Sequence, residues 1–387
     1  MIGPGRIPDS VSGTGVAAHI FSAAEDEPRG WGSLSTAEIA SARNAIWLCQ
    51  THAKLVDNNR GTDYPPAVLI SYKGFHEAAI ARRHAGINAP LGWFHEIQIM
   101  QGPVFKCPTQ VRFGHVTFLS GENATGKSAL WQWLASISDP AWELRRWRRR
   151  LGTNPSLHFS VAYFNPLEHK MSVRVSDVGN IKFTLDNESV PYNPLSSRFI
   201  VISRIDRADI PDYAKEAWDE WSDLERFSAA LRLDPIEIEN ILPYVGGPER
   251  FVKRVFIDES PSEEDDSPAR SIFRVELNGN AGRTLPYGAL SSGEQSYVLI
   301  ELGVALAKFS SHYSPTVLIL DILSSLDKIG QKEWAEYLSA PEHLFQTVIE
   351  LRASLQNVPV SPSISSQIVL FSGRPPHVEI RQVGDYQ

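Results

Sequence analysis

The residues best suited to chemistry lie in one short segment, Gly121-Glu122-Asn123-Ala124-Thr125-Gly126-Lys127-Ser128, which has the pattern G-x-x-x-x-G-K-S. The apolar residues 116–119 before it predict a strand, and residues 129–134 after it, beginning at Ala129, predict a helix. A strand, a glycine-bounded loop and a helix together form a setting that binds phosphate through backbone N–H groups and the helix dipole. The alternative is a glycine-rich turn that enters an ordinary helix.

Five residues of this segment are candidate nucleotide-binding residues: Gly121, Asn123, Gly126, Lys127 and Ser128. The glycines allow the backbone to curl so that its N–H groups point at an anion. Lys127 is expected to reach the β- and γ-phosphates, and the Ser128 hydroxyl is expected to ligate Mg²⁺. The pattern therefore predicts ATP and Mg²⁺ as cofactors.

A second metal-binding candidate is Asp321, which ends the apolar run Thr316-Val317-Leu318-Ile319-Leu320. We expect this run to be a strand beside the phosphate-loop strand in a parallel sheet. Asp321 would then lie near the Mg²⁺ that Ser128 ligates, as the acid of a Walker B pattern does.

Composition excludes several classes of protein. The chain has 387 residues, 42% of them hydrophobic and 21% charged, so it can bury a sizeable core. The net charge of −8 excludes a uniformly basic nucleic-acid coat. Two cysteines give neither a disulfide framework nor a cysteine metal cluster. No apolar run has the length of a membrane span, and the N-terminus lacks a signal pattern, so we expect a cytoplasmic protein without membrane contact.

Two regions follow from the pattern of elements. Residues 1–90 are expected to form an N-terminal accessory segment, and residues 91–387 the nucleotide-binding domain. This domain includes a helical lobe at about 205–248 and a half at 286–387 that contains the Walker B candidate Asp321. Further strands are expected at 94–99, 110–113, 158–163, 171–175, 181–185, 199–202 and 346–351. Acidic residues 259–268 predict a solvated loop.

Three helices and one short strand are expected outside these runs. A capping box at Ser35 and Glu38 predicts a helix that continues through Ile46 and Leu48. A strand is expected at 67–70, just after two prolines. A long amphipathic helix is expected across Ala214, Ala217, Trp218, Trp221, Leu224, Ala230 and Leu231, followed by a helix at 235–242.

The segment Leu290-Ser291-Ser292-Gly293-Glu294-Gln295 opens an expected helix at 297–309. Ser291 or Ser292 can cap this helix. The segment also resembles the signature motif of ABC-type ATPases, and Ser324-Ser325-Leu326-Asp327 resembles their D-loop. The phosphate loop, the signature-like segment, the Walker B pattern and the D-loop-like segment occur in that family's order over roughly residues 93–383. The fold expected from this resemblance is an α/β ABC-type P-loop NTPase with a mixed sheet.

The resemblance implies that two copies bind head to tail around ATP as a homodimer. Ser292, Gly293 and Glu294 of one copy would contact the γ-phosphate held by the phosphate loop of the other copy. The residues of the signature-like segment and the compact lobe resemble RecF/OLD-like ATPases of DNA repair and anti-phage defence more than they resemble transporter subunits. In that setting any nuclease or toxin effector would be a separate chain. An active ATPase acting on DNA and a transporter subunit are the competing functions.

Three catalytic positions depart from the family pattern. Ile322 stands where the glutamate that orients the attacking water is expected, Arg352 stands where a histidine is expected, and no glutamine occurs between Trp133 and Glu294. Ser203 or Arg204 stands in place of that glutamine. Loss of a positioned general base costs about 10²–10⁴-fold in rate. We therefore expect tight ATP binding with weak or absent hydrolysis, with charge stabilisation from Lys127 and Arg352.

The opposing interpretation is that a displaced acid, Asp327 or Glu294, serves as the base. The catalytic candidates are accordingly Asp321, Asp327 and Arg352.

An arginine-rich helix is expected after Asp139-Pro140, with Arg145, Arg146, Trp147, Arg148, Arg149 and Arg150 before Gly152. Arginine contacts phosphates and stacks on bases, so Arg145, Arg146 and Arg149 could bind nucleic acid. A protein interface and a solvated helix face are the two other interpretations.

Overall fold

The computed structural model describes residues 2–4, 11–13, 15–24, 26–84, 91–144, 147, 157–165, 167–176, 180–203, 221–260, 270–279, 283–351 and 366–383. The chain divides into two compact units. The first unit is Met1–Phe94 with Arg145–Ser196, and the second is His95–Leu144 with Ser197–Gln387. Residues 145–196 thus group with the N-terminal residues, while the expected domain boundary at residue 90 stays a prediction.

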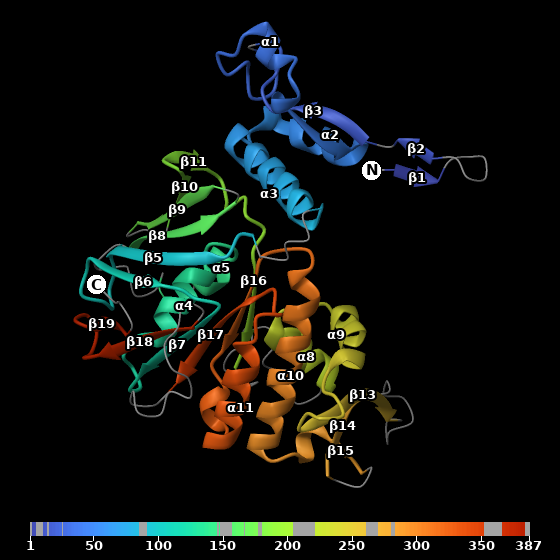
Figure 1. The fold of residues 1–387 in the computed structure, drawn as a ribbon, viewed down its shortest axis with the longest axis vertical. Helices are drawn as coiled ribbons and strands as arrows, with labels where there is room; N and C mark the ends of the chain where they lie inside the picture. Colours follow the sequence, from blue (N-terminus) through green and yellow to red (C-terminus); the bar gives the residue numbers. More distant parts are fainter. Residues whose placement is uncertain are drawn as a thin grey trace. The chain divides into compact units, whose positions relative to one another are not determined.

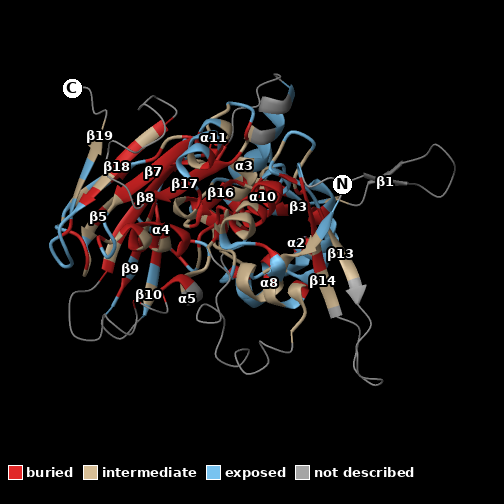
Figure 2. Ribbon diagram, turned by 90° about the horizontal axis from the view of Figure 1, so that it is seen from below, coloured by how far each residue is buried: buried red, intermediate tan, exposed pale blue. Residues whose placement is uncertain are grey.

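A six-stranded sheet forms the centre of the second unit (Figure 1), in the order β12 (Arg198–Ile202), β16 (Thr316–Leu320), β17 (Gln346–Leu351), β7 (Val116–Gly121), β18 (Ser366–Ser372), β19 (Glu379–Val383). The first five strands are parallel, and β19 pairs antiparallel with β18. Every residue of β16 and β17 is buried, and Figure 2 colours these strands accordingly. Such continuous burial is typical of parallel strands covered on both faces.

The expected pairing of the 316–320 strand with the phosphate-loop strand is wrong. Strand β17 lies between them, because Leu320 of β16 pairs with Ile349 and Leu351 of β17 pairs with Ser120 of β7. The buried residues of β17 suit this central position, which has no edge exposed to water. A side chain at the end of β17 can therefore reach the phosphate loop directly, whereas Asp321, at the end of β16, lies one strand further away.

Helices cover the sheet. Helix α10 (Ser292–Ser311) contacts β12 and β16, and α4 (Lys127–Ala135) contacts β7 and β17. Residues Leu318, Leu320, Ile349 and Leu351 belong to one apolar cluster with α10. Since side chains alternate along a strand, the residues between them face the opposite side of the sheet. Glu350 is one of these residues.

The remaining elements of the second unit are short. Strands β5 (Phe94–Gln101) and β6 (Thr109–Arg112) form an antiparallel pair, and α5 (Pro140–Glu143) follows α4. Helices α8 (Asp223–Leu231) and α9 (Pro235–Ile241) precede an antiparallel sheet of β13 (Val252–Ser260), β14 (Arg270–Leu277) and β15 (Thr284–Pro286). Helix α11 (Lys328–Leu338) lies between β16 and β17 in the sequence.

The expected long helix through Trp221 and Leu224 is not continuous. Ser222 caps α8 and forms a capping box with Glu225, so a helix begins there. A capping box satisfies the first N–H groups of a helix, and this explains why a separate helix begins after Ser222. Ala214, Ala217 and Trp218 lie outside the described residues. Of the acidic run, Glu259 and Ser260 end β13, and the rest also lies outside them.

The described strands of the first unit pair in three antiparallel groups. Strands β1 (Ile2–Pro4) and β2 (Val11–Gly13) pair, as do β3 (Gly15–His19) and β4 (Ala45–Cys49). A meander joins β8 (Leu157–Phe164), β9 (Glu168–Val175), β10 (Ile181–Leu185) and β11 (Glu188–Val190). Helices α1 (Thr36–Ile39), α2 (Gln50–Asp57) and α3 (Pro66–His84) accompany the N-terminal strands.

Two expectations for the N-terminal residues are wrong. The capping box of Ser35 and Glu38 is present, but α1 ends at Ile39, and 45–49 is strand β4. Residues 67–70 belong to α3, in which Pro66 takes the first helical position. Proline suits that position because its missing N–H is not needed there. The strands expected at 94–99, 110–113, 158–163, 171–175, 181–185, 199–202 and 346–351 are confirmed.

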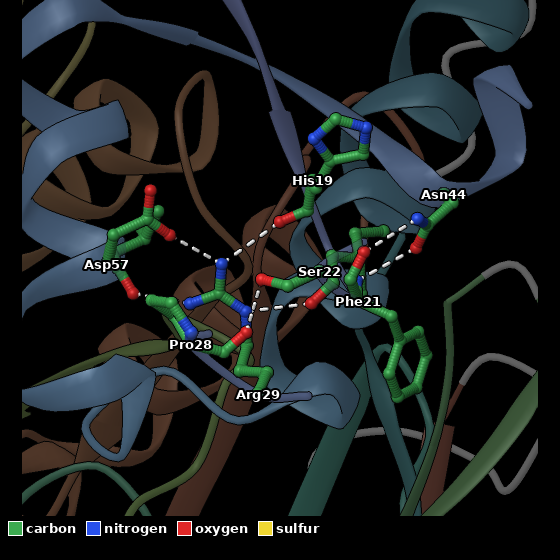
Figure 3. Close-up of polar contacts among 9 residues, drawn as sticks. His19, Phe21, Ser22, Pro28, Arg29, Asn44 and Asp57 are labelled. Atoms are coloured by element: carbon green, nitrogen blue, oxygen red, sulfur yellow. Dashed lines mark hydrogen bonds and ion pairs between the residues drawn. The ribbon is translucent and has the colours of Figure 1, made fainter. Parts of the chain in front are cut away.

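Arg29 joins several segments of the first unit (Figure 3). Its guanidinium donates to the carbonyls of His19 and Ile20 at 3.0 and 2.7 Å and to the Asp57 carboxylate at 2.6 Å. Only 2% of its side chain is exposed. These contacts occupy the guanidinium within the first unit, and removing Arg29 would leave part-buried carbonyl groups without a donor.

Candidate nucleotide-binding site

The phosphate loop has the predicted setting. Strand β7 ends at Gly121, and α4 begins at Lys127 after Gly126, which has a φ of 87°. A Cβ at Gly121 would lie 2.7 Å from the Phe371 carbonyl oxygen, and one at Gly126 would lie 2.5 Å from Val104 Cγ1. Both glycines are therefore required by the geometry of the loop. Asn123 is exposed at the tip of the loop.

Lys127 is folded onto the loop that precedes it. Its Nζ donates to the carbonyl oxygens of Gly121 and Glu122 at 2.8 and 2.7 Å, and the residue is 3% exposed. The ammonium group thus lies inside the curve of the loop, where the positive charge of Lys127 can meet a phosphate. This placement fits the predicted role of Lys127.

Ser128 contacts an acid that the sequence analysis missed. Its hydroxyl donates to Glu350 of β17, with Oγ 2.9 Å from Oε2 and 3.2 Å from Oε1. Trp131 Nε1 donates to the same Oε2 at 3.1 Å, and Lys127 Nζ lies 3.8 Å from Oε1. A charged residue within the buried run Gln346–Leu351 is a signal that could have been read, because buried carboxylates are rare unless paired.

Asp321 lies at the same level of the sheet as Glu350. It directly follows Leu320, which pairs with Ile349, and its backbone N–H donates to the Ile202 carbonyl at 3.0 Å. Positions in register on neighbouring parallel strands face the same side. The carboxyl ends of β16 and β17 thus bring two acids to the edge of the sheet that carries the phosphate loop.

These oxygen atoms suit Mg²⁺. The ion prefers oxygen ligands and is usually bound by one or two carboxylates together with substrate phosphates. The Ser128 hydroxyl and the Glu350 carboxylate lie within 2.9 Å of each other beside the phosphate loop. Among the described residues, no three His, Cys, Asp or Glu side chains form a metal-binding group of their own.

The two candidate displaced bases cap helices. Asp327 caps α11, and its Oδ1 accepts from the Gly330 N–H at 2.8 Å. Glu294 belongs to the capping box of α10, where Oε2 accepts from the Ser291 N–H at 2.7 Å. Ile322 is 2% exposed and joins the apolar core. Each side chain therefore has a structural task, and the catalytic roles of Asp321 and Asp327 stay predictions.

The signature segment begins α10. Ser291 is the cap, so Ser292 is the first helical residue, and both are exposed. A Cβ at Gly293 would meet no atom of the part of the chain that the structure describes within 4 Å. Ser296, one turn further along, accepts from the Ser325 hydroxyl at 2.7 Å and so links α10 to the D-loop-like segment.

A cavity of about 310 Å³ lies beside this helix start. Ser292, Gln295 and Ser296 line it from α10, and Ile322 lines it from the end of β16. The cavity thus connects the signature segment with the residue that follows Asp321.

Several predicted site residues lie outside the described part of the chain. They are Arg145, Arg146, Arg148, Arg149, Arg150, Arg204 and Arg352. Trp147, within the arginine-rich run, is described and buried at 6% exposure. In the part of the chain that the structure describes, no helix is long and apolar enough to cross a bilayer.

No protein-family model and no curated protein matches the sequence. Among solved structures, an SMC head bound to the C-terminal winged-helix domain of ScpA has a TM-score of 0.50 at 14% identity, covering 76% of this chain and 98% of that chain. The SMC head with a coiled coil and joint from Pyrococcus yayanosii has a TM-score of 0.50 at 9% identity, covering 76% and 98%. RecF with ATP has a TM-score of 0.46 at 13% identity, with the same coverage.

These likenesses concern the fold alone, since all identities are low. The fold of the chain is that of SMC head domains, which agrees with the α/β fold that the motifs predicted.

Proposed function

We propose that the protein binds ATP with Mg²⁺, joins a second copy of itself head to tail around that ATP, and hydrolyses it slowly or not at all. The resulting dimer gates a partner effector. The observation that carries this proposal is the start of α10, where Ser292 is exposed and a Cβ at Gly293 would meet nothing within 4 Å. No neighbour among the described residues requires glycine at 293. Close approach of a group from outside the chain would require a residue without a side chain at this position.

A helix start of this kind suits a phosphate. The first N–H groups of a helix have no partner within it, and the dipole favours negative charge. Helix α10 has 20 residues, so its dipole is fully developed. The phosphate loop of one copy would hold ATP from one side, and Ser292 and Gly293 of the other copy would hold the outward-facing phosphate.

Weak hydrolysis follows from the side chains around the site. Ile322 is apolar and buried, and the carboxylates of Asp327 and Glu294 bind backbone N–H groups as helix caps. The contacts described for Asp327 and Glu294 are with their own helices and not with the phosphate loop. Mg²⁺ would supply charge neutralisation of the phosphates, and the chain would supply Lys127 and Ser128 to position them.

The effector is proposed from likeness alone. The similar SMC head is bound to a domain of a partner protein, ScpA. By analogy, this chain would bind a separate protein, such as a nuclease or toxin, in genome maintenance or phage defence. The arginine-rich run could contact nucleic acid in the same assembly.

Sedimentation and turnover measurements test the proposal. Purified protein is expected to change from monomer to dimer on addition of ATP and Mg²⁺, and Lys127→Ala is expected to remain monomeric. Turnover is expected to stay below about 1 s⁻¹, the low end of ordinary enzymes. Rapid turnover stimulated by DNA, without a stable dimer, would favour the competing function of an active ATPase on nucleic acid.

A further inference from the structure

Glu350 is an acid from outside the phosphate loop that contacts two residues of the loop, Lys127 and Ser128. It lies on β17, the strand between β7 and β16, and only 11% of its side chain is exposed. Three polar groups surround its carboxylate: the Ser128 hydroxyl, the Trp131 indole N–H and the Lys127 ammonium. All three come from the first turns of α4.

The hydrogen bonds from Ser128 and Trp131 and the nearby Lys127 ammonium compensate the buried carboxylate. Burying a charge costs several kcal/mol unless it is compensated. Lys127 is 3.8 Å away and donates to the loop carbonyls as well. Glu350 thus has spare oxygen lone pairs beside the residue that is predicted to ligate the metal.

The direction of the hydrogen bond from Ser128 matters. When the Ser128 hydroxyl donates its proton to Glu350, its oxygen lone pairs are left to face a cation. Groups that orient a metal ligand in this way are worth about 10–100-fold in metal affinity when they are mutated. Trp131 in turn fixes the carboxylate by donating to the same oxygen that Ser128 contacts.

We propose that Glu350 is a magnesium-positioning residue of this site: it orients the Ser128 hydroxyl and adds negative charge toward the ion from the strand between those of the phosphate loop and Asp321. This role belongs to a position on β17 that the motif pattern does not include. Because Ile322 is apolar, the end of β16 offers the carboxylate of Asp321 but not a second one from position 322. Glu350 partly compensates by supplying a carboxylate from β17. The inference rests on the proposed binding of ATP with Mg²⁺.

Binding of a fluorescent ATP analogue, measured with Mg²⁺ and again with EDTA, tests the role of Glu350. The wild-type protein is expected to bind more tightly with Mg²⁺. Glu350→Gln is expected to lose about 10-fold or more of that Mg²⁺-dependent gain. Its affinity in EDTA is expected to be unchanged or higher, because a negative charge near the phosphates has been removed. A structural defect would weaken binding equally in both conditions.

Two further variants sharpen the test. Glu350→Asp keeps the charge but shortens the side chain, so it should lose part of the Mg²⁺ gain and serves if Glu350→Gln does not fold. Glu237→Gln is the matched control, since Glu237 pairs with Arg198 at 2.8 Å and makes no described contact with the phosphate loop. It should behave as wild type. Electron paramagnetic resonance of Mn²⁺ with ATP should show weaker ion binding in Glu350→Gln alone.

The outcomes separate this inference from the proposed function. If the wild-type protein gains affinity from Mg²⁺ and Glu350→Gln gains as much within twofold, the role of Glu350 is overturned while ATP binding stands. If the wild-type protein does not bind the analogue with or without Mg²⁺, both the proposed function and the role of Glu350 are overturned.

Discussion

The Glu350 carboxylate accepts a hydrogen bond from the Ser128 hydroxyl, Oε2 to Oγ, at 2.9 Å. The two residues are 222 positions apart in the sequence. The contact joins β17 to the first turn of α4, and it exists because β17 lies between the strands that end in the phosphate loop and in Asp321. The site is therefore assembled from three neighbouring strand ends.

Replacing Gly293 by alanine should separate folding from dimerisation. A Cβ there meets none of the described residues within 4 Å, and alanine is favoured over glycine in a helix by about 1 kcal/mol. We expect unchanged or higher thermal stability and normal ATP binding by the monomer. ATP-dependent dimerisation should weaken at least about 10-fold, because the methyl group occupies the space where an outside phosphate approaches.

Gly126→Ala is the contrasting variant. Here φ is 87° and the new Cβ would lie 2.5 Å from Val104 Cγ1, so the loop itself must distort. We expect ATP binding by the monomer to be lost together with dimerisation. If Gly293→Ala dimerises as wild type does, the start of α10 does not contact a second copy.

Asp327 should tolerate asparagine but not alanine. Asparagine can cap a helix as well as aspartate does, whereas alanine costs about 1 kcal/mol at such a position. We expect Asp327→Asn to keep the wild-type free energy of unfolding and any residual ATP turnover within about twofold. A loss of turnover of about 10²-fold or more with an intact fold would identify Asp327 as a general base.

Arg250 should be important for the stability of α10. It pairs in a bidentate manner with the buried Glu301, at 2.9 and 3.1 Å, and its guanidinium lies 4.5 and 3.8 Å from the ring centroids of Trp334 and Tyr337. Burial raises the pKa of Glu301 while Arg250 opposes that shift. Arg250→Ala leaves this carboxylate without its partner, and we expect a loss of about 3–5 kcal/mol in urea unfolding.

The double variant Arg250→Ala with Glu301→Gln is the control for that loss. It removes the charge that would otherwise be buried alone, so the loss should be smaller than in Arg250→Ala. An Arg250→Ala protein within about 1 kcal/mol of wild type would show that the pair contributes little.

His115, which precedes β7, should make the protein sensitive to acid. Burial, and then the neighbouring His343, lower the pKa of His115 to about 4. Its ordinary pKa of 6.5 applies in the unfolded chain, so between pH 6.5 and 4 the unfolded state binds more protons. Stability should fall as the pH falls through this window, by about 1–2 kcal/mol from His115.

Thermal unfolding of His115→Gln against wild type across pH 4–7 measures this contribution. The variant should lose less stability on acidification than the wild-type protein does. Equal losses would mean that His115 is protonated as easily in the folded protein as in the unfolded chain.

Local patterns carried the successful predictions. The phosphate loop, strands β7, β12, β16 and β17 of the central sheet and the start of α10 all follow from short segments in which glycines, apolar runs and caps agree. The errors arose where two local signals compete. Pro66 was read as a break before a strand, although proline also suits the first position of a helix such as α3.

The metal-positioning side of the site could not be predicted in the same way. Glu350 reaches Ser128 only because of strand order, which short segments do not specify. The sequence placed Asp321 directly beside the phosphate-loop strand, and β17 intervenes. The one available signal was an acid within an otherwise buried strand, and its meaning depends on which helix covers that face.

Mixing two inactive variants tests the head-to-tail dimer most directly. Lys127→Ala removes the phosphate-binding lysine, and Ser292→Arg blocks the start of α10. In a head-to-tail dimer each site takes Lys127 from one copy and Ser292 from the other, so a mixed dimer contains one intact site. We predict that neither variant dimerises alone with ATP and Mg²⁺, and that sedimentation of the mixture shows dimers containing one copy of each. Dimers formed by either variant alone, or none in the mixture while the wild-type protein dimerises, would contradict the account.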